Sequence, residues 1–148
     1  MSRGNISRGI AAVLSGMILL LTGPATAAHA TTAQTTAALA AWDCPVGDLC
    51  VWSGYDGTGS RCNWANADND WMNAPVTCSW SGYNKVKSIY NRGQSTSFLG
   101  VMLYENINYN SNDIWGCIAQ GKKMSFISGI SDGVYLASHR WTNSFPYC

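Results

Sequence analysis

The sequence predicts an all-β domain, a double Greek-key β-sandwich that is cross-linked by disulfides. Three observations predict this class. Short apolar or aromatic stretches recur roughly every eight to twelve residues between clusters of Gly, Asn, Ser, Asp and Thr, a spacing typical of sandwiches and barrels. A strand-and-turn pattern occurs twice along the chain. Six cysteines follow one another from residue 44 to the last residue.

The short stretches provide six candidate strands. Residues 86–91 alternate apolar and polar side chains, as a strand with one face in water should. Residues 101–104 are uniformly apolar, so we expect this strand to be buried on both faces. The expected strands are 49–53, 60–64, 88–91, 101–105, 124–127 and 133–137.

The repeated pattern favours two Greek-key units. Residues 51–59 and 103–111 each combine the end of a strand, an aromatic residue and a polar turn. A serine stands beside a later strand in each case, at Ser88 and at Ser125. Chance similarity in a turn-rich sequence is the alternative explanation.

An even number of cysteines in a short chain with a secretory N-terminus indicates a disulfide framework. Six cysteines allow fifteen pairings, and the sequence alone does not select one. We favour sequential pairing, because the first two bridges then close short loops and the third fixes the C-terminus. The bridges would be Cys44 to Cys50, Cys62 to Cys78 and Cys117 to Cys148.

A zinc site is the alternative use of these cysteines. The sequence contains no C-x-x-C motif, and His139 is the only histidine after the N-terminal segment. We expect His139 to lie on the surface near the C-terminus. The cysteines therefore favour disulfides over metal.

The N-terminus has the layout of a secretory signal peptide. Arg3 and Arg8 flank the start of an apolar run over residues 10–21, and small residues follow up to Ala30. The run is shorter than the roughly 20 residues of a membrane-spanning helix. We assign residues 1–30 to a signal peptide, 31–42 to a linker or pro-segment and 43–148 to one domain, and we expect secretion to the extracellular space.

The charge balance excludes some classes of partner. The chain carries nine basic and eight acidic residues, and Arg3 and Arg8 would leave with the signal peptide. The remaining chain is close to neutral and has no basic stripe, which argues against binding to nucleic acid or to an anionic membrane surface. We expect a monomer.

The repeated units resemble those of the βγ-crystallin superfamily. In that family each Greek key carries an aromatic residue, an aromatic–x–Gly turn and a later serine. Trp52 and Gly59 match the first unit, and Tyr104 and Tyr109 match the second. Gly57 stands where an aromatic residue is usual, and the glycine of the second unit is replaced by a serine. The resemblance covers most of residues 43–141 and implies a βγ-crystallin-like fold.

A narrower resemblance lies at residues 44–54, which read C-P-V-G-D-L-C-V-W-S-G. This segment is similar to the N-terminus of secreted actinobacterial metalloproteinase inhibitors, small βγ-crystallin-like proteins that block thermolysin-type zinc proteases. The resemblance implies a bridge between Cys44 and Cys50. It also implies a non-catalytic protein whose partner is a secreted metalloprotease.

Those inhibitors present a reactive bond between a cysteine and a branched aliphatic residue in a disulfide-held loop. Cys117 and Ile118 provide the most similar pair here, with Trp115 in the docking segment 112–118. Thermolysin-like enzymes favour a large apolar residue after the scissile bond, as the resemblance implies, and Ile118 would fill that pocket. In the family another cysteine follows shortly, whereas here the next is Cys148. The alternative is that Trp115 and Ile118 are core residues of a strand anchored by Cys117.

Calcium is the other ligand that the resemblance suggests. The family binds it through paired Asn or Asp and Ser or Thr oxygens, which suit a hard cation. Here Lys87 stands at a ligand position in residues 83–88, and Lys122 and Lys123 precede Ser125 in the second candidate site. Ammonium groups oppose a divalent cation, so we expect no cofactor and weak or no calcium binding.

Two further candidates carry less chemistry. Asp68 and Asp70 lie between Trp64 and Trp71, where oxygens suit calcium and indole rings suit sugars, but a solvated loop whose rings pack on a sheet explains the same residues. A single histidine and bridged cysteines leave no nucleophile–base pair, so we assign no catalytic residues.

The sequence therefore predicts a secreted inhibitor of extracellular zinc metalloproteases. The alternative is a non-catalytic, killer-toxin-like βγ-crystallin module that recognises cell-wall polysaccharide or competing cells. An exposed apolar loop bounded by cysteines would favour the inhibitor, and an exposed row of tryptophans would favour the sugar binder.

Overall fold

The computed structural model describes residues 40–144 and residue 148. The expected signal peptide and nearly all of the expected linker lie outside the described residues. Within the described part, no helix is long and apolar enough to cross a membrane.

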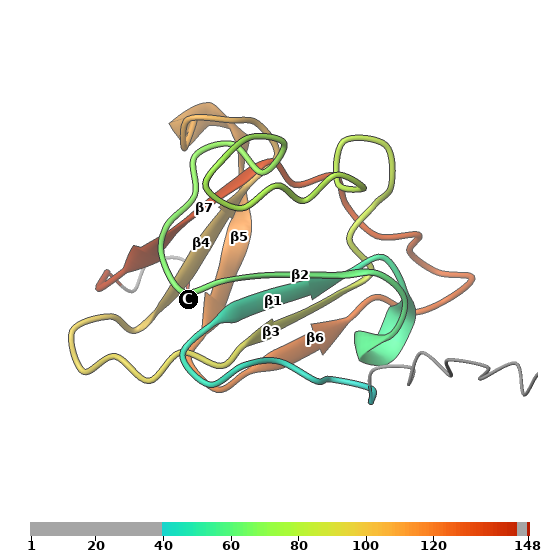
Figure 1. The fold of residues 1–148 in the computed structure, drawn as a ribbon, viewed down its shortest axis with the longest axis horizontal. Coiled ribbons are helices and arrows are strands. Elements are labelled where there is room, and N and C mark those ends of the chain that lie inside the picture. Colours follow the sequence, from blue (N-terminus) through green and yellow to red (C-terminus); the bar gives the residue numbers. More distant parts are fainter. Residues whose placement is uncertain (1–39, 145–147) are drawn as a thin grey trace, which may run out of the picture. The chain divides into compact units, whose positions relative to one another are not determined.

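The strands form two antiparallel sheets (Figure 1), which confirms the all-β class. The first sheet has the order β2–β1–β3–β6 and consists of β1 (Leu49–Trp52), β2 (Arg61–Trp64), β3 (Ser88–Asn91) and β6 (Lys123–Ser125). The second has the order β5–β4–β7 and consists of β4 (Gly100–Tyr104), β5 (Ile114–Ala119) and β7 (Ser138–Thr142). Two short 3₁₀ helices follow β1 and β4, namely η1 (Tyr55–Gly57) and η2 (Ser111–Asp113).

The domain has two halves, the first from β1 to β3 and the second from β4 to β7. Each half contributes a segment to the sheet of the other half. β6 follows β5 in sequence but pairs with β3 in the first sheet. In the reverse direction, Asp68 forms an isolated antiparallel bridge to His139 of β7 in the second sheet. This exchange is compatible with the double Greek key expected from the sequence.

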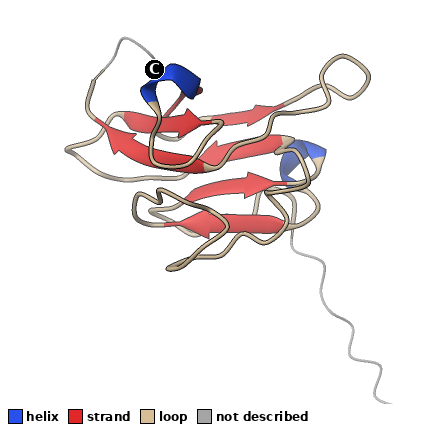
Figure 2. Cartoon of the chain, turned by 90° about the horizontal axis from the view of Figure 1, so that it is seen from above, coloured by secondary structure: helices blue, strands red, loops and turns tan. Residues whose placement is uncertain are grey.

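The main core lies between the two sheets, which Figure 2 shows as two layers of strands. Apolar side chains from β1, β3, β4 and β5 are almost fully buried there, and each stabilises the fold by roughly 1.5–3 kcal/mol. The strand residues of this core include Leu49, Val51, Ile89, Val101, Leu103 and Ile118. A second, smaller cluster forms around Trp52, with Trp42 packed against it at a ring-centroid distance of 5.5 Å.

A buried serine holds the turn after the first strand of each half. Ser88 Oγ donates to the carbonyl oxygen of Gly54 (2.7 Å) and accepts from the backbone N–H of Gly57 (2.9 Å). Ser138 Oγ makes the corresponding contacts after β4, donating to Asn106 O (2.6 Å) and accepting from the N–H of Tyr109 (3.3 Å). The expectation that Ser125 holds the second turn is wrong.

Ser125 instead lies on β6, the strand exchanged between the sheets. Its hydroxyl accepts a hydrogen bond from the backbone N–H of Asp56 in η1 (2.9 Å). It therefore supports the first turn, because the exchange carries β6 away from its own half.

The structure contains the three disulfides that sequential pairing predicts. They are Cys44–Cys50, Cys62–Cys78 and Cys117–Cys148, with Cα–Cα distances of 5.8, 5.7 and 4.8 Å. The last closes a loop with a sequence separation of 31, which contains the end of β5 and all of β6 and β7. Bridges of this kind stabilise by roughly 2–4 kcal/mol, mainly because they restrict the unfolded chain.

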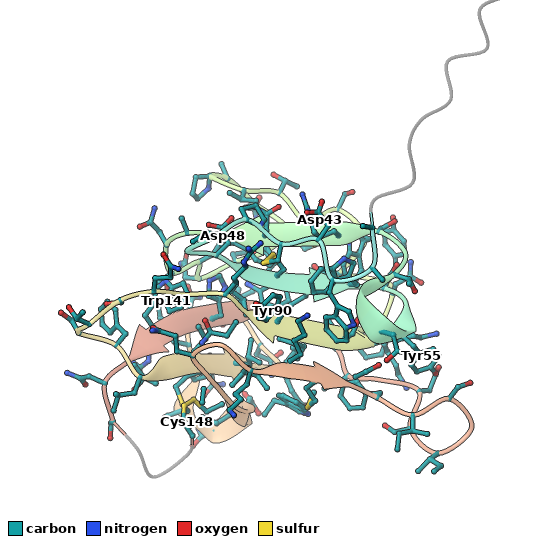
Figure 3. All side chains as sticks on the ribbon, turned by 90° about the horizontal axis from the view of Figure 1, so that it is seen from below. Asp43, Asp48, Tyr55, Tyr90, Trp141 and Cys148 are labelled. Atoms are coloured by element: carbon teal, nitrogen blue, oxygen red, sulfur yellow. A yellow bond between two sulfur atoms is a disulfide. The ribbon has the colours of Figure 1, made fainter. Side chains whose placement is uncertain are left out.

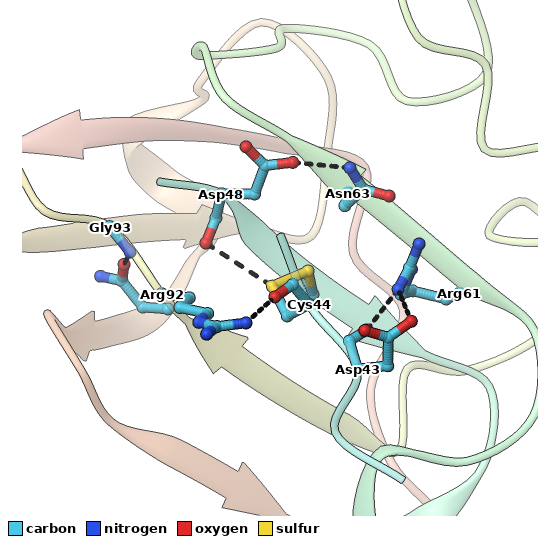
Figure 4. Close-up of a disulfide and its surroundings, with 9 residues drawn as sticks. Asp43, Cys44, Asp48, Arg61, Asn63, Arg92 and Gly93 are labelled. Atoms are coloured by element: carbon cyan, nitrogen blue, oxygen red, sulfur yellow. Dashed lines mark hydrogen bonds and ion pairs between the residues drawn. A yellow bond between two sulfur atoms is a disulfide. The ribbon is translucent and has the colours of Figure 1, made fainter. Parts of the chain in front are cut away.

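Polar contacts fix the segment around the first disulfide to the sheet (Figure 4). Arg92 donates to the carbonyl oxygen of Cys44, and Asn63 donates to the carboxylate of Asp48 (2.6 Å). Arg61 pairs with Asp43 at 2.8 Å. The C-P-V-G-D-L-C segment thus has a structural role, because these contacts fix the chain where it leads into β1.

β5 and β7 are not among the six strands expected from the sequence, and one expected strand does not form. The expected strand 133–137 is absent, and Val134 makes only an isolated bridge to Val86. Gly133 has a φ of 91°, and a Cβ there would overlap the carbonyl of Val86, so the chain turns where a strand was expected. The final strand is β7, five residues farther along.

Candidate functional site

The predicted docking segment, residues 112–118, is ordered by its own hydrogen bonds. Asn110 caps η2 by accepting from the backbone N–H of Asn112 (3.1 Å), and its amide donates to the carboxylate of Asp113. β5 then begins at Ile114 and pairs with β4. The segment is therefore a turn and a strand.

The three residues of the candidate reactive bond lie on β5. Cys117 is bridged to Cys148, and Trp115 is half-buried against the main core. The side chain of Ile118 is 7% exposed and belongs to the main core, and its carbonyl accepts from the amide of Asn91 (2.9 Å). In this structure Ile118 can enter a partner's pocket only if β5 leaves β4.

β5 forms an edge of its sheet and leads to an exposed loop. Its outer side faces no other strand among the described residues. At the start of β5, the ring of Trp115 packs on Phe126 with a centroid distance of 5.8 Å. Phe126 begins the connection from β6 towards β7, so this contact joins the predicted segment to that connection.

We call residues 126–133 of this connection the apolar loop. Ile127 and Ile130 are 62% and 81% exposed, and residues 128 and 129 between them are also exposed. The backbone N–H groups of Ile130 and Ser131 both donate to Ile127 O (3.0 Å each), which closes a turn at the tip. Ile130 is the most exposed of the large hydrophobic side chains in the described part of the chain.

The two ends of the apolar loop are held by adjacent residues of one segment. At the first end, the N–H of Phe126 donates to Lys87 O (2.9 Å). Just beyond the second end, Val134 exchanges two backbone hydrogen bonds with Val86, of 2.8 and 3.0 Å. Compact surface loops whose ends meet in this way often carry function.

Charged side chains brace the second end of the loop. Asp132 lies 3.4 Å from Lys87 Nζ and 3.7 Å from Lys85 Nζ. The hydrogen bond and charge of Lys87, with a smaller contribution from Lys85, lower the pKa of the Asp132 carboxyl. Lys87 also lies over the ring of Tyr55 at 5.1 Å, and Figure 3 shows Tyr55 at the end of the domain where the connection after β6 extends from the fold.

The tryptophans beside Asp68 and Asp70 are not available for sugars. Trp64 and Trp71 are 2% and 0% exposed and stack on each other at 4.5 Å. Their rings pack on the sheet, as the alternative explanation of this segment held.

The expectation that His139 lies on the surface is wrong. The imidazole is fully buried on β7, 5.1 Å from the ring of Trp64. Nδ1 accepts from the indole N–H of Trp71 (2.9 Å), so Nε2 carries the proton and donates to Asn66 O (3.0 Å). Burial lowers the pKa of His139 to about 3, and the imidazole is neutral at physiological pH.

The two candidate calcium sites already use their serine oxygens. Ser88 and Ser125 hold the turn at η1, and Lys87 places its ammonium beside Asp132. Across residues 40–144 and 148, no group of three or more His, Cys, Asp or Glu side chains is arranged to hold a metal ion. Weak or absent calcium binding stays a prediction.

The two exposed isoleucines of the apolar loop were not predicted from the sequence. Residues 124–127 were expected to form a strand, and residues 128–132 had no expected role. The available indication was the segment I-S-G-I-S-D-G, in which isoleucines stand among turn-forming residues.

Comparison with known proteins gives one family. The family model described as peptidase inhibitor family I36 matches residues 37–118, which is more than half of the chain. The match covers the first three strands of the first sheet, then β4 and most of β5. No curated protein and no solved structure matches the chain significantly.

Proposed function

The chain belongs to peptidase inhibitor family I36, and on that premise we propose that it is secreted and inhibits an extracellular zinc metalloprotease of the thermolysin type. Membership makes it a non-catalytic protein whose partner is a peptidase. The family match is the observation that carries the proposal. The metalloprotease class rests on the similarity of residues 44–54 to known metalloproteinase inhibitors.

The architecture supports inhibition by a substrate-like loop. Two sheets and three disulfides make a stiff support, so a loop presented by it loses little conformational entropy on binding. The Cys117–Cys148 loop contains both β5 from Cys117 onward and the exposed apolar loop. A segment cut within it stays joined to the rest of the molecule.

That the bond between Cys117 and Ile118 is the reactive bond stays a prediction. Ile118 is buried, so this mechanism requires the edge strand β5 to open in the complex. Breaking the pairs between β4 and β5 adds a cost to binding, which a loop that is already exposed does not carry.

The alternative, a killer-toxin-like module that binds cell-wall polysaccharide, has less support. An exposed row of tryptophans would favour such a site, whereas Trp64 and Trp71 are buried. The large hydrophobic side chains exposed in the described part include no tryptophan.

The proposal is tested by titrating thermolysin with the oxidised protein and measuring residual hydrolysis of a peptide substrate. We expect activity to fall in proportion to added inhibitor, with one monomer bound per enzyme. A chymotrypsin-type serine protease, titrated in parallel, should stay active because it lacks the zinc site for which the loop is a substrate analogue.

Protein that has been reduced and alkylated is the control for the fold. It should lose inhibition, because the disulfides restrict the unfolded chain and hold the loop ends. Full thermolysin activity at micromolar oxidised protein would contradict the metalloprotease assignment and leave only membership of the inhibitor family.

A further inference from the structure

Resting on the proposed function, we infer that the apolar loop, and not β5, enters the cleft of the protease. Ile130 fills an apolar pocket of the enzyme, and the bond between Gly129 and Ile130 is the one presented to its zinc. The partner surface is therefore a concave cleft with one apolar pocket beside the reacting centre.

The tip of the apolar loop is exposed, as a bound reactive segment must be. A protease must surround the peptide bond that it binds, and the bond must therefore stand out from the inhibitor. Residues 127–130 are four consecutive exposed residues, and Ile130 is 81% exposed. A large apolar side chain in water gains most when a pocket encloses it, which is how interface anchors act.

The ends of the apolar loop are held in place by hydrogen bonds and ion pairs. Both ends are hydrogen-bonded to the neighbouring residues Val86 and Lys87, and Asp132 adds ion pairs to Lys85 and Lys87. Phe126 packs on Trp115 of β5. The tip is thus exposed while its stem is fixed, so binding requires only that the turn closed on Ile127 O opens and the tip becomes extended.

The apolar loop and the end of β5 lie in the same disulfide-closed ring. The loop belongs to the same Cys117–Cys148 ring as the bond between Cys117 and Ile118, but it presents its isoleucine without breaking a sheet. Ile118, at 7% exposure, fills the core position opposite Val101. The structure thus assigns the two isoleucines different roles, Ile118 to the core and Ile130 to the protease.

Slow hydrolysis by the protease would identify the peptide bond between Gly129 and Ile130 as the one presented. Hydrolysis adds water across the amide, leaving a carboxylate on Gly129 and an amine on Ile130. The products, ending at Gly129 and starting at Ile130, remain linked through Cys117–Cys148. They separate only after reduction.

The test combines a variant with the cleavage site of the unaltered protein. Ile130→Asp should weaken inhibition of thermolysin by more than about 30-fold, because a charge would enter the apolar pocket. Ile107→Asp is the matched control, since Ile107 is also exposed (45%) but lies after β4, outside the loop. Both variants should keep the melting temperature of the unaltered protein.

Prolonged incubation with thermolysin gives the second readout, which needs no variant. The new chain should appear only on a reducing gel and begin Ile-Ser-Asp. A chain that begins Ile-Ala-Gln would show cleavage before Ile118 and overturn the inference, as would equal inhibition by Ile130→Asp and the unaltered protein. Absence of inhibition by the unaltered protein overturns the proposed function and this inference together.

Discussion

At the scale of single residues, His139 shows how strongly burial sets chemistry in this fold. Its imidazole lies against Trp64 and Trp71, and both ring nitrogens have hydrogen-bond partners. The folded state therefore favours the neutral form of the His139 imidazole over the protonated form. Its ordinary pKa is 6.5, and burial lowers it to about 3.

This pKa predicts a loss of stability in mild acid. Because the folded pKa lies below the unfolded one, the unfolded chain takes up the proton first, and the stabilisation is complete above pH 6.5 and is lost as the pH falls towards 3. Between pH 7 and pH 5 we expect the free energy of unfolding to fall by about 2 kcal/mol. Urea unfolding at both pH values measures it.

His139→Gln is the control for this pH dependence. Glutamine keeps an acceptor for the Trp71 indole but does not titrate, so the variant should lose much less stability over the same interval. Parallel stability profiles for the two proteins would show that His139 is not the titrating group.

The sequence did not reveal this role because polar neighbours surround His139. The segment S-H-R-W-T carries no apolar alternation, and a histidine near the C-terminus is ordinarily exposed. Its burial depends on Trp64 and Trp71, which reach it only once Asp68 pairs with β7. Contacts between residues so far apart in sequence are not encoded in a local pattern.

At the scale of elements, Ser88 and Ser138 each form hydrogen bonds to the turn after the first strand of their own half. We call these two sets of contacts the serine clamps. Ser88 is buried and makes two hydrogen bonds to the turn around η1. Without its hydroxyl, the carbonyl of Gly54 and the N–H of Gly57 would lose these partners. A buried polar group without a partner destabilises by about 1–3 kcal/mol.

Ser88→Ala should therefore lower the free energy of unfolding by about 1–3 kcal/mol. Chemical denaturation measures this, and Ser128→Ala in the exposed tip of the apolar loop is the matched control, with an expected change within about 0.5 kcal/mol. A Ser88→Ala protein as stable as the control would rule out the clamp.

The strands with a clear pattern were predictable, and the others were not. β1 to β4 and β6 agree with the expected strands to within a few residues at their ends, because each carries an apolar or aromatic residue in a short stretch between turn-forming residues. For β5 the sequence offered a strand only as the alternative explanation of Trp115 and Ile118, and β7 is largely polar. Both are defined by pairing with β4, which is a tertiary contact.

At the scale of the whole molecule, the two sheets, the exchange of β6 between them and the three disulfides stabilise the fold. The two segments that the sequence suggested as calcium sites contain Lys87 and Lys123. Lys87 pairs with Asp132, and Lys123 lies over the rings of Trp42 and Tyr90. Both candidate segments thus carry an ammonium group, which opposes the binding of a divalent cation.

Calcium should therefore leave the melting temperature unchanged. A ligand that binds only the folded state raises the melting temperature, and the rise grows with the logarithm of its concentration above Kd, so thermal unfolding with millimolar calcium and with a chelator is a direct measurement. A rise of several degrees in calcium would contradict this prediction.

The exchange between the halves also determines what each half would expose on its own. β6 pairs with β3 in the sheet of the first half, and Asp68 makes an isolated bridge to β7 in the sheet of the second. Without these contacts the backbone edges of β3 and β7 would be open, and open strand edges pair with other chains. Each half therefore protects the other from aggregation.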